Sequence, residues 1–175
     1  MAQVELKVKY GPENSAVSTP TQPASLAFVG ADVSPEVDPE DYPIVVSLNT
    51  AYSYERYLFI ELVDNSNILS IKNIRVWRSQ ILDNSGQPVP GANIYFGNTR
   101  VYASPTADKS TIATIPIPVS DPGSSSPNVT IGGSYAGELT NAGDTSDFIV
   151  CQLELNPSVM KGGTFTINFA WVEVL

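Results

Sequence analysis

Residues 164–174 read TFTINFAWVEV, an unbroken alternation of large apolar side chains with small or polar ones. One side of this pattern carries four large apolar residues: Phe165, Ile167, Phe169 and Trp171. A period of two residues is that of a β-strand with one buried face, and four such side chains on that face require a substantial core. The segment therefore predicts a strand in an all-β protein.

Further strand signals occur along most of the chain, as short runs rich in β-branched and aromatic residues. These runs are Gln3–Lys9, Ala24–Val29, Ile44–Leu48, Leu58–Val63, Ile71–Arg78, Asn93–Phe96, Thr111–Ile115 and Asp147–Leu155. Connections rich in glycine and proline separate them, so we expect little helix and an antiparallel β-sandwich or jelly roll. Asn156-Pro157 and Gly162-Gly163, between the last two strands, predict a hairpin with a longer loop.

The first strand has a clean division between an apolar and a charged face. Val4, Leu6 and Val8 lie on one face, and charged side chains lie on the other. Such a strand can pair with its own sheet or, as an arm, with the edge of a neighbouring subunit, and both alternatives stay open. Val4, Leu6 and Val8 are therefore candidate partner-binding residues.

The segment that follows this strand, residues 11–23, is too polar and proline-rich to form a regular element. We therefore expect a flexible N-terminal strand or arm with its linker over residues 1–23, and a single β-sandwich domain over residues 24–175.

The chain is acidic and has few charged residues for its length of 175. Nine basic against eighteen acidic side chains give a net charge of −9 and a pI near 4.3. Such a field repels phosphate backbones and anionic membrane surfaces, so we expect no nucleic-acid or membrane partner. No apolar run reaches transmembrane length, and the first residues show no secretion signal, so we expect a protein made in the cytoplasm.

The residues that most catalytic sites need are missing. The chain has no histidine and one cysteine, so a Ser-His-Asp triad is impossible. Gly132-Gly133-Ser134 is neither a P-loop nor a dinucleotide fingerprint. Cys151 lies in an apolar run and is expected to be a small buried hydrophobe. We predict no enzyme activity, no catalytic or cofactor-binding residue, no cofactor and no small-molecule ligand.

Acidic side chains gather in two places. The denser group lies among prolines and contains Asp32, Glu36, Asp38, Glu40 and Asp41. It lacks the spacing of an EF-hand loop, so a solvated acidic loop is favoured over a calcium site, and no metal is predicted. Asp144 and Asp147 lie in a turn, where we expect them to accept hydrogen bonds from nearby main-chain amides.

Tyrosines cluster around residues 52–57. Tyr52, Tyr54 and Tyr57 surround Glu55-Arg56. Exposed tyrosines form sugar platforms or the central contacts of protein interfaces, whereas buried ones belong to a core with their hydroxyls at its rim. Tyr52 and Tyr54 are added to the candidate partner-binding residues.

Several strand-and-turn segments resemble a known class of proteins. These segments are Tyr57–Glu61 with Asp64–Ser66, Ile71–Trp77, Tyr102–Ala107, Ile115–Pro118 with Asp121–Gly123, and Thr145–Val150. Together they resemble small β-sandwich accessory structural proteins of tailed bacteriophage particles, of the head decoration type. The resemblance spans roughly the C-terminal two thirds of the chain and does not include the N-terminal strand or the acidic loop.

The resemblance implies a virion structural protein, assembled in the host cytoplasm, that binds and reinforces neighbouring capsid subunits. Its partners would be capsid or other virion proteins, and it would form a homo-oligomer. The alternative is a carbohydrate- or receptor-binding β-sandwich module of a tail, fibre or surface protein.

Overall fold

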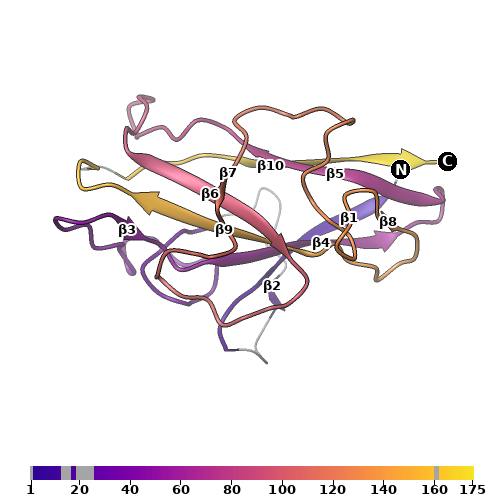
Figure 1. Cartoon of the computed structure of the whole chain (residues 1–175), viewed down its shortest axis with the longest axis horizontal. Coiled ribbons are helices and arrows are strands. Elements are labelled where there is room, and N and C mark those ends of the chain that lie inside the picture. Colours follow the sequence, from indigo (N-terminus) through magenta and orange to yellow (C-terminus); the bar gives the residue numbers. More distant parts are fainter. Residues whose placement is uncertain (1, 13–16, 19–25, 160–161) are drawn as a thin grey trace.

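The computed structural model describes residues 2–12, 17–18, 26–159 and 162–175, and within these ranges it contains strands but no helix. Two antiparallel sheets pack against each other around an apolar core (Figure 1). The larger sheet contains β1 (Gln3–Lys9), β2 (Val17–Ser18), β3 (Ala51–Tyr52), β4 (Arg56–Asp64), β6 (Ala92–Thr99), β7 (Ile115–Pro116) and β9 (Phe148–Leu155). The smaller sheet contains β5 (Ser70–Arg78), β8 (Glu138–Leu139) and β10 (Ile167–Val174). The prediction of an all-β antiparallel sandwich is confirmed.

Strand order explains how the sheets are built. The larger sheet runs β2-β1-β4-β9-β6-β7, with β3 also paired to β9, and the smaller sheet runs β10-β5-β8. The long strands β4, β9 and β6 occupy the centre of the larger sheet. Their inward side chains, which include Leu58, Ile94 and Ile149, are almost completely buried and form the centre of the core.

The N-terminal strand belongs to the sheet of its own chain. β1 pairs antiparallel with β4, and this register sets Val4, Leu6 and Val8 on the core side. On the opposite face, Lys7 forms an ion pair with Glu61 at 2.6 Å. Of the two alternatives for this strand, the structure shows pairing within the chain. The domain boundary between residues 23 and 24 lies outside the described residues and stays a prediction.

The predicted hairpin between the last two long strands is wrong. β9 lies between β4 and β6, so both of its edges are already paired. β10 instead crosses to the smaller sheet and pairs antiparallel with β5. The glycine- and proline-containing connection therefore joins the two layers of the sandwich and does not turn within one sheet.

β5 contains a β-bulge. This bulge explains why apolar residues occur at both odd and even positions of the strand. Ala170 pairs with Arg75 and Val172 with Lys72, so β5 contains one extra residue at this point. Asn73 lies there with a φ of 52°, the left-handed conformation that asparagine tolerates better than most residues. Because the bulge shifts the alternation by one residue, Ile71 and Ile74 both reach the core.

Three expected strands do not form as predicted. Residues 26–29 and 44–48 form no strand, and of Thr111–Ile115 only Ile115 enters one, the two-residue β7. The loop of residues 103–114 is held against the outer face of the larger sheet by the buried amide of Gln152. That amide donates to the carbonyls of Ser53 and Asp108 and accepts from the Ser110 N–H.

Beneath this loop lies a second, smaller apolar cluster, made by Tyr57, Tyr102, Ala113 and Val150. The Tyr57 and Tyr102 rings meet edge to face, with centroids 4.8 Å apart. Burial raises the pKa of Tyr57 to about 12. The loop and this cluster therefore cover part of the outer face of the larger sheet.

Candidate functional site

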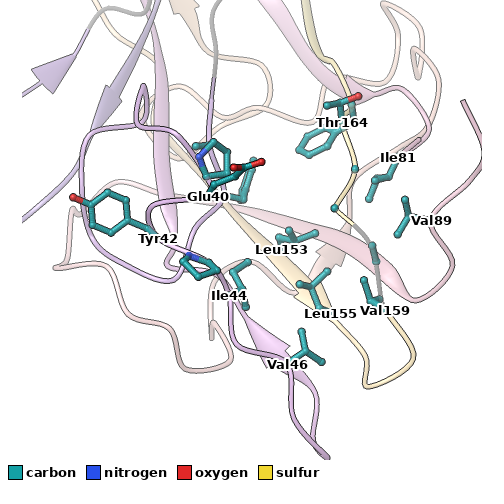
Figure 2. Close-up of a pocket in the computed structure, with 18 of the residues that line it drawn as sticks. Glu40, Tyr42, Ile44, Val46, Ile81, Val89, Leu153, Leu155, Val159 and Thr164 are labelled. Atoms are coloured by element: carbon teal, nitrogen blue, oxygen red, sulfur yellow. The ribbon is translucent and has the colours of Figure 1, made fainter. Parts of the chain in front are cut away.

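An apolar cleft of about 730 Å³ opens beside the inner face of the larger sheet (Figure 2). Leu153 and Leu155 of β9 lie at its centre, and Ile81, Val89 and Val159 line the side opposite Glu40 and Tyr42. The remaining lining residues are Leu26, Ala27, Phe28, Pro39, Pro43, Ile44, Val46, Ala92, Gly162, Gly163, Thr164 and Phe165. Its volume and its apolar lining are those of typical ligand or side-chain pockets.

A buried arginine fixes one wall of this cleft. The Arg56 side chain is completely enclosed and donates from Nε to the Ala27 carbonyl at 2.9 Å and from Nη1 to the Val33 carbonyl at 2.7 Å. Burial lowers the pKa of its guanidinium to about 10, and the carboxylate of Asp32 partly opposes this shift. Arg56 thereby holds the segment that carries Leu26, Ala27 and Phe28 against β4.

Asp32 and Tyr102 connect this wall to the end of β1. The Gly11 N–H donates to Asp32 Oδ1 at 2.8 Å, and the Tyr102 hydroxyl donates to the Gly11 carbonyl at 2.6 Å. Gly11 has a φ of 81°, a conformation that glycine adopts without steric cost. The wall of the cleft and the N-terminal strand are thus part of one hydrogen-bonded unit.

Residues 43–50 run along the rim of the cleft, just before β3, without regular secondary structure. Ile44 and Val46 line the cleft, whereas Val45 and Leu48 are 80% and 93% exposed. No hydrogen bond joins the main chain of residues 44–50 to any residue that the structure describes. An apolar segment with free main-chain groups can receive an added strand.

An acidic loop lies next to this segment. Glu36, Asp38, Glu40 and Asp41 are all exposed, and Asp38 accepts the Glu40 N–H at 2.9 Å. Within the described ranges, no group of three or more acidic or cysteine side chains is placed to hold a metal ion. The loop therefore gives this end of the molecule a local negative charge.

The cleft offers binding groups of a simple kind. Its polar side chains are Glu40, Tyr42 and Thr164, and the rest of its lining is aliphatic, aromatic or main chain. Such a surface favours an apolar side chain or a ligand with a large apolar part, oriented by one carboxylate and two hydroxyls. Cys151 lies apart from it, fully buried in the core, where burial raises the pKa of its thiol to about 12. The prediction of a buried cysteine is confirmed.

None of the five candidate partner-binding residues from the sequence lines this cleft. Val8 is completely buried in the core, and Val4 and Leu6 are half-buried against it. Tyr52 and Tyr54 are both half-buried. Tyr52 lies opposite Glu154 of β9, and the Tyr54 N–H donates to the Val29 carbonyl at 3.0 Å. Their role in partner binding stays a prediction.

Tyr52 takes part in a second polar group, on the outer face of the larger sheet. It lies opposite Glu154 in the β3–β9 pairing, and the Tyr95 hydroxyl donates to Glu154 Oε1 at 3.5 Å. Desolvation, and then the Glu154 carboxylate, raise the pKa of both tyrosines. Tyr95 and Glu154 lie about 40 and 100 positions further along the chain than Tyr52, so no local pattern predicts that the three come together.

The cleft has no continuous signal in the sequence, because its lining comes from segments far apart in the chain. The usable signal was the run Ile44–Leu48, which is uncharged and lies directly after the acidic group. We interpreted this run as a strand with pairing partners, whereas its main chain is unpaired within the described part of the chain.

Comparison with known proteins gave no match: no family model, no curated protein and no solved structure is similar to this chain. Across the described residues, no helix has the length and apolar character needed to cross a membrane.

Proposed function

We propose that the chain is a virion structural protein, a decoration or accessory subunit that attaches to neighbouring capsid subunits and reinforces them. Attachment uses one surface, the docking face, which consists of residues 43–50, the adjoining cleft and the acidic loop of residues 36–41. One observation carries the proposal. Val45 and Leu48 are exposed on a segment whose main chain bonds to no described residue, beside a cleft with a mainly apolar lining.

Each part of the docking face supplies a different kind of contact. The free N–H and C=O groups of residues 44–48 pair with an extended segment of the partner, and the cleft accepts an apolar side chain from it. The exposed carboxylates of the acidic loop select a partner with basic side chains at that position, because complementary charge gives orientation and speed of association. Many copies on a symmetric lattice make such modest contacts collectively strong.

This role uses no enzyme chemistry and no cofactor, and it places the protein in the virion after assembly in the host cytoplasm. The net charge of −9 supports a position on the outside of the shell, since that charge repels packaged nucleic acid. A stable attachment buries roughly 1,600 Å² in total, so the contact extends beyond the docking face itself.

The proposal is tested with particles from the biological source of the chain. Mass spectrometry of purified particles should find the protein in stoichiometric amounts. Purified V45D/L48D should bind stripped particles at least tenfold more weakly than the unaltered protein. V119D introduces one aspartate at a valine that is 66% exposed and lies outside the docking face, and it should bind normally. Absence of the protein from particles would refute the proposal, and equal binding of V45D/L48D would refute the docking face.

A carbohydrate- or receptor-binding module is the second candidate, because Tyr52 and Tyr95 lie on either side of Glu154. Two tyrosine rings beside a carboxylate match the stacking and hydrogen bonding that sugars need. A glycan array separates the candidates. Specific sugar binding that is lost in Y52A and kept in Y135A, a change at another accessible tyrosine, would favour the second function.

A further inference from the structure

The edges of the two sheets are not equally protected. β2, β7 and β8 end their sheets as strands of two residues each, and β7 contains Pro116, which has no N–H to donate. β10 ends the smaller sheet as a strand of eight residues. Short strands and prolines are the common means of blunting an edge, and a long uninterrupted edge invites pairing with another strand.

The main-chain groups on the free side of β10 can be assigned from its hydrogen bonds. The carbonyls of Thr166 and Val174 accept from Ser79 and Leu69, on the side of β5. In an antiparallel pair the direction of these groups alternates, so the N–H and C=O of Ile167, Phe169 and Trp171 point to the free edge. No described residue pairs with them there.

The side chains of this edge also lack the usual protection. From Ile167 to Val172 the strand contains no charged residue and no proline. Ile167, Phe169 and Trp171 pack against the core but remain partly exposed, as does every residue of the strand. A strand placed beside β10 would therefore cover apolar side chains as well as satisfy main-chain groups.

We propose that β10 pairs antiparallel with β10 of a second copy of this chain. With Phe169 on the two-fold axis, Ile167 of each copy lies opposite Trp171 of the other, and about six main-chain hydrogen bonds form. The two smaller sheets join into one continuous sheet of six strands. This inference goes beyond the proposed function, since it holds whether or not the protein attaches to a particle.

The strip along this edge is uncharged and can pair with itself, so a second copy of this acidic chain can meet it without placing like charges in contact. Two chains with a net charge of −9 repel each other unless the strip where they meet is uncharged. Residues 162–172 provide such a strip. The one charged residue of β10, Glu173, lies outside it and accepts the Ala2 N–H at 2.8 Å. Figure 1 shows the N and C labels close together, at the end of β10 that carries Glu173.

The register can be tested by exchanging charges. Asn168 of one copy lies opposite Ala170 of the other on the outer face, twice by symmetry. N168D/A170D places two acidic pairs across the axis and should weaken the dimer, measured by sedimentation equilibrium, about tenfold or more. N168K/A170D differs at one position, places Lys opposite Asp, and should keep the dimer. Residues 168 and 170 are half-buried beside Trp77 and the buried Arg75, so urea denaturation of both variants is measured alongside, and the comparison uses variants that remain folded.

Hydrogen exchange gives an independent measurement. The amides of Ile167, Phe169 and Trp171 should exchange more slowly as protein concentration rises, whereas those of Asn168 and Ala170, already bonded to β5, should not change. A chain that stays monomeric at millimolar concentration would overturn the proposal. So would a dimer that dissociates in V45D/L48D but is insensitive to the exchange at residues 168 and 170, because it would use the docking face.

Discussion

Replacing Val8 by alanine measures directly whether the N-terminal strand is part of the folded body. Val8 is the one β1 side chain that is completely buried, and it lies opposite Leu58 at the centre of the core. An arm that binds only to a neighbouring subunit would contribute nothing to the stability of the isolated chain. A strand that is integral to the sheet would contribute as other core residues do.

The expected loss follows from the burial. Val8→Ala removes two methyl groups, and each costs about 0.8 kcal/mol of transfer free energy. The cavity left between two well-packed sheets adds about 1 kcal/mol, because the surrounding strands cannot collapse into it. The free energy of unfolding should therefore fall by about 2–3 kcal/mol. At roughly 2–4 °C per kcal/mol for a chain of this size, the Tm should fall by about 5–10 °C.

Urea denaturation followed by tryptophan fluorescence measures this loss, with the m value checked for constancy. Val101→Ala is the matched control, because that valine is 69% exposed and its change should cost less than about 0.5 kcal/mol. Deleting residues 1–10 should prevent folding, since it uncovers the buried β4 residues that pair with β1. Refutation would be a V8A protein within about 0.5 kcal/mol of the unaltered one.

Three further predictions concern other parts of the fold. The Cys151 thiol, with its pKa raised to about 12 by burial, should not react with Ellman's reagent at pH 8 until the protein is denatured. Asn73→Val should lower the free energy of unfolding, measured by urea denaturation, by about 1–2 kcal/mol, because β-branched residues are strained at positive φ. Asn73→Gly is its control and should change that free energy by less than about 0.5 kcal/mol. Hydrogen bonds from the Ser66 amide, the Arg75 side chain and the Asn141 amide hold the pKa of Asp64, Asp121 and Asp144 respectively below the ordinary value. The pKa of each of these aspartates is lower in the folded state than in the unfolded state. The stability that they give is therefore fully present above the unfolded pKa and is lost as pH falls through the folded pKa. The urea midpoint of the protein should fall between pH 5 and pH 2, and an unchanged midpoint would contradict this.

Local alternation was sufficient to predict the strands whose two faces meet different environments. Gln3–Lys9 is predicted to the residue, because its apolar side chains face the core and its lysines face outward. The strand predicted at Ile71–Arg78 forms as β5, although the bulge at Asn73 shifts its alternation and exchanges the faces of the residues beyond it. One local pattern failed for a physical reason. The apolar run of residues 44–48 has the composition of a strand but no hydrogen-bonding partner among the described residues.

The two candidate sites could not be predicted from the sequence because topology brings their parts together. Leu153 reaches the cleft because β9 lies at the centre of the larger sheet, and Phe165 reaches it because the chain crosses to the other sheet after β9. Neither fact has a local signal, and a hairpin was the natural expectation from Asn156-Pro157. The wall built on Arg56 depends on a contact between residues 29 positions apart, which no periodicity reveals.

The acidity of the chain has a structural explanation that also bears on the docking face. Much of the chain lies in loops, and buried or crowded loop amides need acceptors that strand ladders do not supply. Seven aspartates accept main-chain N–H groups in this way: Asp32, Asp38, Asp64, Asp83, Asp121, Asp144 and Asp147. The local role predicted for the last two is confirmed.

These carboxylates are therefore already engaged in building loops. By contrast, Glu36, Glu40 and Asp41 accept no hydrogen bond and form no ion pair with any described residue. All three are exposed, and all three belong to the docking face. Three carboxylates that the fold does not bond internally thus lie together beside the unpaired segment of residues 43–50. A contact with a basic partner at these three carboxylates would therefore leave the aspartate-bonded loops intact. Binding at the docking face should weaken as the salt concentration rises, because salt screens the three carboxylates, whereas the free energy of unfolding should change little.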